Sequence, residues 1–284
     1  MKFTKFYALG NDFLIVDSDE VAILEEPGDL AHRLCERHTG VGADGILLIR
    51  VVDRARGEVN FRIFNADGTE AEISGNGLRC AAAYLYSQQK IDTPVVRFQT
   101  VIGERTCELV RRTEGGFLLK TDLGVPRFAS ADIPFDDGSP HDRIVDYPLM
   151  INAKTYPVTV VSIGNPHCDV FIDRFLDRFE WHGLGREIES HPFFPHRTNI
   201  EFIRVRNRGE IEVVFWERGV GETLSSGSGA AAAAVAAMVK GLVDRVVTVR
   251  TEMGSLLVEW PSDEARIVQT GPAEFAFVGS FLFK

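Results

Sequence analysis

The stretches Ser74-Gly75-Asn76-Gly77 and Ser226-Gly227-Ser228-Gly229 decide the fold, because each leads directly into an alanine-rich run. Leu78 to Ala83 follow the first stretch, and Ala230 to Ala236 follow the second. A glycine-rich turn before such a run predicts the N-terminus of a buried helix, where free backbone N–H groups attract a carboxylate or phosphate. The two serines lie 152 positions apart in a chain of 284 residues, which predicts two matching halves.

The composition is that of an ordinary globular protein, with 45% hydrophobic and 25% charged residues. A net charge of −10 argues against nucleic-acid and anionic-membrane partners. The longest apolar run, Ala230 to Val239, is too short to span a bilayer, and residues 1–6 lack the apolar core of a signal peptide. We therefore expect a cytoplasmic protein. Its four scattered cysteines lack metal-ligand spacing and are expected to be free thiols.

Alternating apolar residues predict many strands, including a hairpin with strands at 199–206 and 210–216. The expected helices are Leu30 to Arg37 with Asp29 as its cap, Gly77 to Gln89, Arg174 to Glu189, and Gly229 to Val239. Both glycine-opened helices are apolar on nearly all faces, which predicts that each is buried within its own sheet. We expect the first half to span 1–119 and the second 120–267, with 268–284 returning to the first half.

Four polar segments each follow an apolar strand, where loops commonly carry function. They are Gly10 to Phe13, Phe64 to Gly68, Gly164 to His167, and Trp216 to Gly219. One such segment would merely indicate a turn, but four, together with Thr198-Asn199 and the two helix openings, indicate a binding site.

Several side chains of these segments suit an amino-acid ligand. Asparagine can bind both an ammonium and a carboxylate, and arginine can grip a carboxylate with two hydrogen bonds. A histidine and a glutamate could orient or activate a neighbouring acid or base, although a lone histidine is more often structural. The candidates are Asn11, Asn65, Asn165, Asn199, Arg218, His167 and Glu217.

At this point the chain resembles the diaminopimelate epimerase family, a group of pyridoxal-independent amino-acid epimerases. The resemblance covers essentially the whole chain and is carried by Leu9 to Phe13, Arg37 to Gly45, Phe64 to Arg79, Gly164 to His167, and Trp216 to Gly229. It implies an α+β fold of two pseudo-symmetric domains, each an antiparallel β-sheet or barrel wrapped around a central α-helix, with the site in the cleft between them.

The resemblance also implies an activity, which is conversion of LL-diaminopimelate to the meso form in the synthesis of lysine and peptidoglycan precursors. It implies a small amino-acid substrate and neither a metal nor an organic cofactor. A homodimer is left open as the assembly.

The family's roles can be carried onto this sequence residue by residue. Its two catalytic cysteines, a thiolate base and a thiol acid, fall on Ser74 and Ser226. His167 and Glu217 would stand beside the first and second catalytic positions. The substrate would be held by Asn11, Asn65, Gly75, Asn76, Asn165, Asn199, Glu217, Arg218, Gly227 and Ser228.

The two serines depart from the family's chemistry. A cysteine thiol with a pKa of about 8.5 needs a shift of only one or two units to ionise usefully. A hydroxyl with a pKa of about 16 needs a shift of roughly eight units, or about 11 kcal/mol, whereas a helix dipole supplies about 2 kcal/mol at best. Serine could still relay a proton to a neighbouring base. None of the four cysteines replaces the missing thiols; Cys168 follows His167, but strand neighbours point to opposite faces.

Three interpretations of function therefore remain open: an active epimerase, a related racemase or dehydratase of another substrate, and a ligand-binding member that has lost catalysis. The serines could be natural or introduced Cys→Ser changes. Natural divergence is favoured, because Ser225, Ser226 and Ser228 stand where the family usually has Ala, Cys and Thr.

Overall fold

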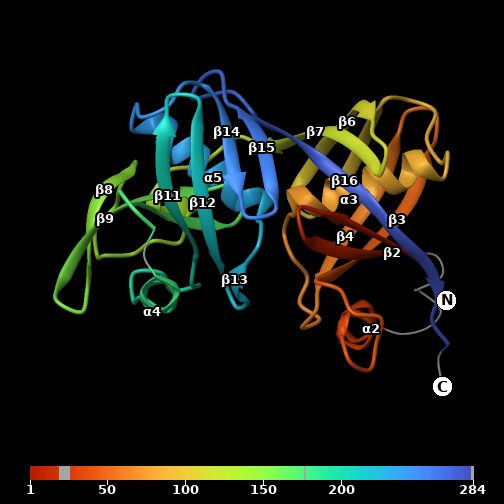
Figure 1. Cartoon of the computed structure of the whole chain (residues 1–284), viewed down its shortest axis with the longest axis horizontal. Coiled ribbons are helices and arrows are strands. Elements are labelled where there is room, and N and C mark those ends of the chain that lie inside the picture. The colour runs from red at the N-terminus through yellow and green to blue at the C-terminus, as the bar shows by residue number, and fades with distance from the viewer. Residues whose placement is uncertain (19–25, 176, 283–284) are drawn as a thin grey trace. The chain divides into compact units, whose positions relative to one another are not determined.

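The computed structural model describes residues 1–18, 26–175 and 177–282. The chain forms two compact units (Figure 1). Unit 1 comprises Met1–Asp122 and Thr270–Lys284, and unit 2 comprises Leu123–Gln269. Unit 1 therefore holds both ends of the chain, and the amino group of Met1 donates a hydrogen bond to the carbonyl of Phe281 at 3.0 Å.

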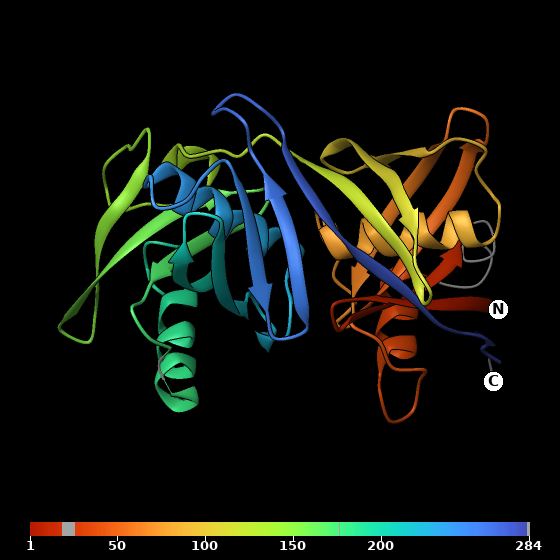
Figure 2. The same cartoon turned by 45° about the horizontal axis from the view of Figure 1, so that its top comes forward.

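Unit 1 is a ring of strands around one helix. Its strands are β1 (Lys2–Ala8), β2 (Asn11–Asp17), β3 (Gly45–Asp53), β4 (Glu58–Asn65), β5 (Val95–Thr100), β6 (Gly103–Arg112), β7 (Gly116–Gly124) and β16 (Ile267–Ser280). They neighbour one another in that order, and β16 also pairs with β1, which closes the ring. Helix α2 (Pro27–Cys35) packs against β3 and β4 on the outside (Figure 2).

Unit 2 repeats this plan around a second helix. Its strands are β8 (Ile144–Ile151), β9 (Lys154–Ser162), β10 (Pro166–Phe171), β11 (Asn199–Asn207), β12 (Glu210–Glu217), β13 (Gly221–Thr223), β14 (Val246–Thr251) and β15 (Gly254–Glu259). The neighbours run β15-β14-β12-β11-β10-β9-β8, with β13 beside β12. Helix α4 (Arg178–Glu189) packs outside β11 and β12, and the 3₁₀ turn η1 covers Ser130–Asp132.

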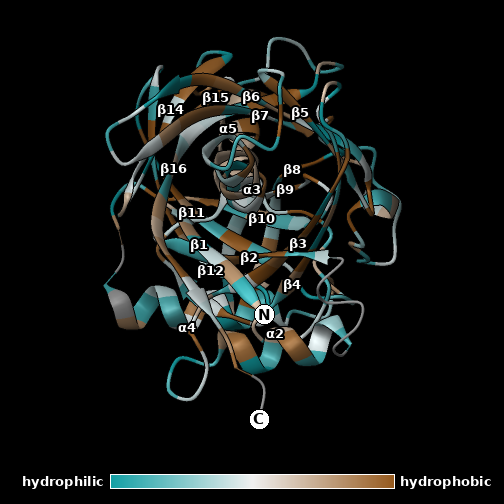
Figure 3. Cartoon of the chain, turned by 90° about the vertical axis from the view of Figure 1, so that its right-hand side faces the viewer, coloured by the Kyte–Doolittle hydropathy of each residue, from teal (hydrophilic) through white to brown (hydrophobic). Residues whose placement is uncertain are grey.

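The central helices are α3 (Gly75–Ser87) in unit 1 and α5 (Gly227–Val239) in unit 2. Every residue of α5 from Gly227 to Met238 is buried. Figure 3 shows α3 within the strands of unit 1 that surround it. The strands approach so closely that a Cβ atom added at Gly229 would lie 2.5 Å from Glu201 Oε1. Small residues are therefore required at the start of α5.

The expected fold class is confirmed, with one refinement in strand direction. The pairs β2–β3 and β4–β5 in unit 1, and β10–β11 and β12–β14 in unit 2, are parallel, so each sheet is mixed rather than wholly antiparallel. The hairpin of β11 and β12 is confirmed, as are the free thiols of the four cysteines, all of them buried. No helix among the described residues has both the length and the apolar character to cross a membrane.

Several predicted helix boundaries are wrong. Helix α2 begins at Pro27 after Glu26, so Asp29 lies in the first turn and is not the cap; proline favours the first helical position because its φ angle is already helical. Helix α4 begins at Arg178, later than predicted, because Asp177 and Glu180 form a capping box there. Residue 176 of the predicted helix, residues 19–25 of the expected first half, and residues 283–284 of the expected return segment lie outside the described residues.

Both central helices begin two residues earlier than predicted, because a serine caps each of them. Ser74 Oγ accepts a hydrogen bond from the N–H of Gly77 at 3.0 Å, and Ser226 Oγ accepts one from the N–H of Gly229 at 3.2 Å. The glycines thus belong to the first helical turn. Ser225 differs from its neighbour, because its Oγ is buried and has no hydrogen-bond partner among the described residues.

The adjacent serines should therefore respond in opposite directions to the same substitution. Ser226→Ala removes a cap and should lower the free energy of unfolding by about 1 kcal/mol. Ser225→Ala removes an unsatisfied buried hydroxyl and should raise it by about 1 kcal/mol. Urea unfolding of the parent and both variants measures the difference. A loss of stability in Ser225→Ala equal to that in Ser226→Ala would contradict this account.

Candidate functional site

The start of α3 carries the candidate site of unit 1. Ser74 is the cap, and Asn76, two residues later, is fully buried. The side-chain amide of Asn76 donates to Asn11 Oδ1 at 3.3 Å, while its oxygen accepts a hydrogen bond from the guanidinium of the buried Arg79. The structure therefore brings three of the predicted residues, Ser74, Asn76 and Asn11, into one group.

A charged network holds Asn11 in this group. Asn11 Nδ2 donates to Asp44 Oδ2 at 2.7 Å, and Arg37 Nη2 lies 2.8 Å from the other oxygen of Asp44 and 3.1 Å from Asp12. Burial would raise the pKa of Asp12, but hydrogen bonds from Lys5 and Arg37 outweigh it and lower that pKa. Burial raises the pKa of Asp44. The stretch Arg37 to Gly45 carries part of the family resemblance, but the resemblance assigned it no role. In the structure this stretch holds Asn11, a candidate substrate-binding residue.

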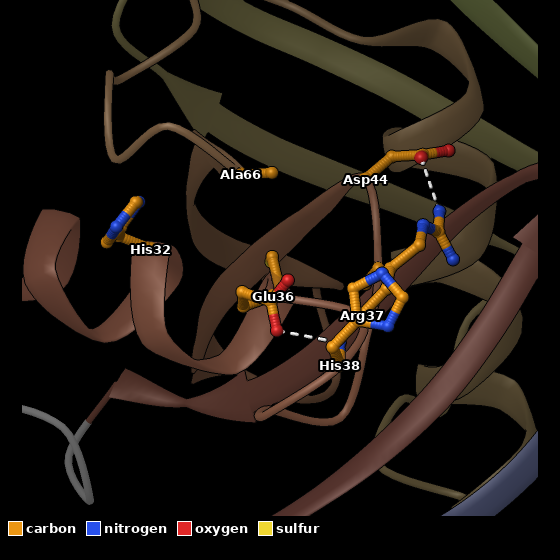
Figure 4. A pocket seen from close by; sticks show the side chains of 8 residues that line it. His32, Glu36, Arg37, His38, Asp44 and Ala66 are labelled. Atoms are coloured by element: carbon orange, nitrogen blue, oxygen red, sulfur yellow. Dashed lines mark hydrogen bonds and ion pairs between the residues drawn. The ribbon is translucent and has the colours of Figure 1, made fainter.

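A pocket of about 430 Å³ opens beside this network (Figure 4). Its lining residues are His32, Cys35, Glu36, Arg37, His38, Ala43, Asp44 and Ala66. None of the predicted site residues lines it, although Asp44 contacts both the pocket and Asn11. Asn65 ends β4, where it pairs with Gly45 of β3, and its amide donates to Thr69 Oγ1 at 3.0 Å.

In unit 2, the start of α5 carries a serine with a carboxylate partner. Ser226 Oγ donates to Glu217 Oε2 at 3.1 Å, while the same oxygen accepts the capping hydrogen bond from Gly229. Ser226 is 4% exposed, so little water competes for its hydroxyl. This pair can relay a proton, because Ser226 Oγ can pass its own proton to the carboxylate as it accepts one from another group, so that no free alkoxide forms.

His167 lies on β10 and is fully buried between two oxygens. Its Nδ1 is 2.8 Å from Glu201 Oε1, and its Nε2 is 2.9 Å from Asn165 Oδ1. Burial lowers the pKa of His167 to about 3, while the charge of Glu217 opposes this shift and that of Arg218 assists it. The imidazole is therefore neutral at physiological pH. Asn165 in turn donates to Ser228 Oγ at 3.4 Å, which joins His167 to the start of α5.

The side chain of Asn199 contacts the backbone of Arg218. Asn199 Oδ1 accepts from the backbone N–H of Arg218 at 2.9 Å, and its amide donates to the carbonyl of Pro166 at 2.8 Å. Asn199 therefore ties the loop after β12 to the start of β10. The Arg218 guanidinium donates to the carbonyl of His196 at 3.4 Å.

Glu189 also holds the loop after β12, and this role was not predicted from the sequence. One of its oxygens accepts from Trp216 Nε1 at 2.7 Å, and the other accepts from the N–H of Gly219 at 2.9 Å. It ends α4, 27 residues before Trp216, and no local pattern connects the two segments. Its role follows only from the packing of α4 beside β12.

Three further buried polar residues, also missed, lie beneath His167. Thr159, Asp169 and Glu201 are each fully buried, on β9, β10 and β11 respectively. Burial raises the pKa values of Asp169 and Glu201 well above their usual range, and each is raised further by a nearby acid, Glu201 for Asp169 and Glu217 for Glu201. Within the described residues, no cluster of histidine, cysteine, aspartate and glutamate is arranged to hold a metal ion.

Comparison with known proteins bears on this arrangement. The family model for diaminopimelate epimerase matches residues 3–128 and 159–276. The chain belongs to the diaminopimelate epimerase family. The diaminopimelate epimerase of Pelotomaculum thermopropionicum is 42% identical over 286 residues, covering 100% of both chains. That of Moorella thermoacetica is 40% identical over 287 residues, covering 99% of each.

Solved structures share the fold of this family member at low sequence identity. A probable proline racemase from Agrobacterium radiobacter K84 superposes with a TM-score of 0.72 at 14% identity, covering 100% of this chain and 93% of that one. A phenazine biosynthesis protein of the PhzF family from Bacillus anthracis gives 0.68 at 16% identity, covering 100% and 99%. These two similarities concern the fold alone.

The raised pKa of Asp169 predicts a pH-dependent cost to stability. A carboxyl whose pKa is higher in the folded than in the unfolded state takes up a proton on folding, so its contribution to stability is full below the unfolded pKa and is lost as the pH rises. Asp169→Asn should therefore stabilise the protein more at pH 8 than at pH 5, by up to about 1.4 kcal/mol per pH unit. Urea unfolding at the two pH values measures this. A gain independent of pH would mean that Asp169 is ionised in the folded protein.

Proposed function

We propose that this chain epimerises LL-diaminopimelate to the meso form, without a cofactor, and that Ser74 and Ser226 occupy the two acid/base positions. Membership of the family supports the reaction. The observation that carries the role of the serines is the hydrogen bond from Ser226 Oγ to Glu217, because it gives a weakly acidic hydroxyl a place to send its proton.

In this mechanism Glu217 is the proton acceptor and Ser226 is the relay. The α-proton of the substrate passes to Ser226 Oγ as the proton of that hydroxyl passes to Glu217. Ser74 protonates the carbanion on its other face, which a hydroxyl can do because a carbanion is far more basic. Glu217 then loses its proton to solvent and Ser74 regains one, so solvent deuterium should appear at the α-carbon.

The remaining predicted residues bind the substrate in this proposal. Asn11, Asn65, Asn165, Asn199 and Arg218 would contact its charged groups, with Gly75, Asn76, Gly227 and Ser228 supplying contacts at the helix starts. The low pKa of His167, a result of burial, makes it a weak base, so its place is to orient Asn165 through the contact between Nε2 and Asn165 Oδ1. A cytoplasmic location and a homodimer stay predictions.

A ligand-binding member with little catalysis is the second candidate. This candidate is favoured because the pKa of a serine hydroxyl would have to fall by roughly eight units for the hydroxyl to ionise near neutral pH. A helix dipole cannot supply a shift of that size. Exchange of the substrate α-proton with deuterated water separates the two candidates, since a binding protein would show none. Formation of an alkene would instead indicate a dehydratase.

Restoring sulfur should raise the rate. The double change Ser74→Cys and Ser226→Cys places ionisable thiols at both helix starts, and we expect epimerisation to increase by orders of magnitude. Each single change should help much less, because inversion needs a competent base on one face and a competent acid on the other. Stereochemical conversion of diaminopimelate and α-carbon deuterium uptake are measured for the parent and all three variants. A double variant that binds substrate but stays inactive would contradict the proposed serine positions.

Arg218 should contribute to substrate affinity even where catalysis is slow. Arg218→Ala removes a charge-assisted hydrogen bond and should weaken diaminopimelate binding by roughly 1.5–3 kcal/mol. Arg208→Ala, in the turn between β11 and β12, is the matched control and should bind like the parent. Titration calorimetry compares the three proteins. Equal affinity of Arg218→Ala and the parent would remove Arg218 from the site.

A further inference from the structure

The three polar residues beneath His167 form one row across the sheet of unit 2. Asp169 pairs with Thr159 on β9 and with Glu201 on β11, so the three side chains lie side by side. Residues 167 and 169 share a face of β10, as residues two apart on a strand do. The row therefore lies on the same face as His167, towards α5, whose facing residues are mostly alanine.

Most of the polar atoms in this row are unsatisfied. Thr159 Oγ1, both carboxyl oxygens of Asp169 and Glu201 Oε2 are buried without a hydrogen-bond partner among the described residues. An unpaired buried polar group costs about 1–3 kcal/mol, and an unpaired buried charge costs more. Two carboxylates side by side here would lack compensating donors. The neutral, protonated form of each acid is the one this environment stabilises.

Glu201 alone connects this row to the candidate site. Its Oε1 lies 2.8 Å from His167 Nδ1 and also directly beneath the start of α5, where a Cβ atom on Gly229 would approach it to 2.5 Å. The Glu201 side chain is thus held between β10 and the first turn of the helix that carries Ser226 and Ser228.

The two oxygens that contact the His167 ring, Glu201 Oε1 and Asn165 Oδ1, indicate which ring nitrogen carries the proton. A neutral imidazole carries one N–H and one acceptor nitrogen. If Glu201 carries a proton, it can donate to Nδ1, and Nε2–H can donate to Asn165 Oδ1; both observed contacts are then hydrogen bonds without any buried net charge. If Glu201 were ionised, its second oxygen would be a buried anionic atom with no donor. The titratable groups near this contact are Asp169 on β10 and Glu217 with Arg218 at the end of β12.

We propose that Glu201 is a positioning residue: as a neutral carboxylic acid it donates a hydrogen bond to His167 Nδ1 and fixes the imidazole with its proton on Nε2, directed at Asn165. The chain of hydrogen bonds then runs from Glu201 through His167 and Asn165 to Ser228 at the start of α5. Its effect on catalysis rests on the proposed function, but the protonation of His167 does not.

The first test is NMR of the protein labelled with ¹⁵N-histidine, with the His167 signals identified by their loss in His167→Gln. We expect a neutral ring with Nδ1 unprotonated and Nε2 protonated, unchanged between pH 5 and pH 8. Glu201→Gln should keep this pattern, since a glutamine amide can also donate to Nδ1. Glu201→Leu should lose it, and Thr159→Val, a change in the same row that does not contact His167, should keep it. A charged ring, or a proton on Nδ1, in the parent would overturn the proposal.

The second test is exchange of the substrate α-proton with deuterated water. We expect Glu201→Leu to lose about 10²-fold, the scale of a misplacement of about 1 Å, with Glu201→Gln and Thr159→Val close to the parent. Exchange by Glu201→Leu at the parent's rate would overturn the positioning role. A parent that shows no exchange would contradict the proposed function instead, and the NMR result would still decide the state of Glu201. Should Glu201→Leu fail to fold, the parent and Glu201→Gln spectra decide it.

Discussion

The close approach of the strands to the central helices is the constraint on which the rest of the structure depends. In unit 2 even a Cβ atom added at Gly229 would lie 2.5 Å from Glu201 Oε1 and 2.9 Å from Phe215, so glycine is the residue that fits this position without a shift of its neighbours. A helix that is buried along its length still has free N–H groups in its first turn, and these need acceptors. The serine before each helix accepts a hydrogen bond from one of them. Packing and capping therefore both favour the Ser-Gly-X-Gly pattern, and the proposed substrate contacts would use the same two turns.

The sequence was most informative where function and local structure depend on neighbouring residues. The glycine turns, the buried central helices and the hairpin of β11 and β12 could all be predicted, because each depends on residues a few positions apart, whereas the serine caps that move both helix starts were not predicted. The start of α2 was misplaced because an acid such as Asp29 and a proline are both typical of a first helical turn; the helix begins at Pro27, whose φ angle is already helical. The mixed direction of the strands was not predicted either, because pairing between distant segments leaves no local pattern.

The residues missed in the sequence share a physical cause. Glu189, Asp169 and Glu201 act through contacts across strands or between a helix and a loop, and their significance depends on register and burial. An acid in a strand normally indicates a solvent-facing position, so the sequence favours an exposed site for Asp169 and Glu201. The structure buries both under α5, where small helix residues leave space for polar side chains. The same alanine pattern that predicts close packing thus also permits a polar interior.

The two units use the same cap but surround it with different charges. In unit 1 the asparagine of the α3 start is held by Arg79 and, through Asn11, by a network of Lys5, Arg37 and two aspartates. In unit 2 the corresponding surroundings are acidic and neutral, with Glu217 on Ser226 and an uncharged His167 beside Asn165. A thiol could use a helix start alone, because a small shift in pKa ionises it. A hydroxyl needs an acceptor for its proton, and Ser226 has one in Glu217. In the proposed mechanism, the serine with a carboxylate to receive its proton is therefore the one in unit 2.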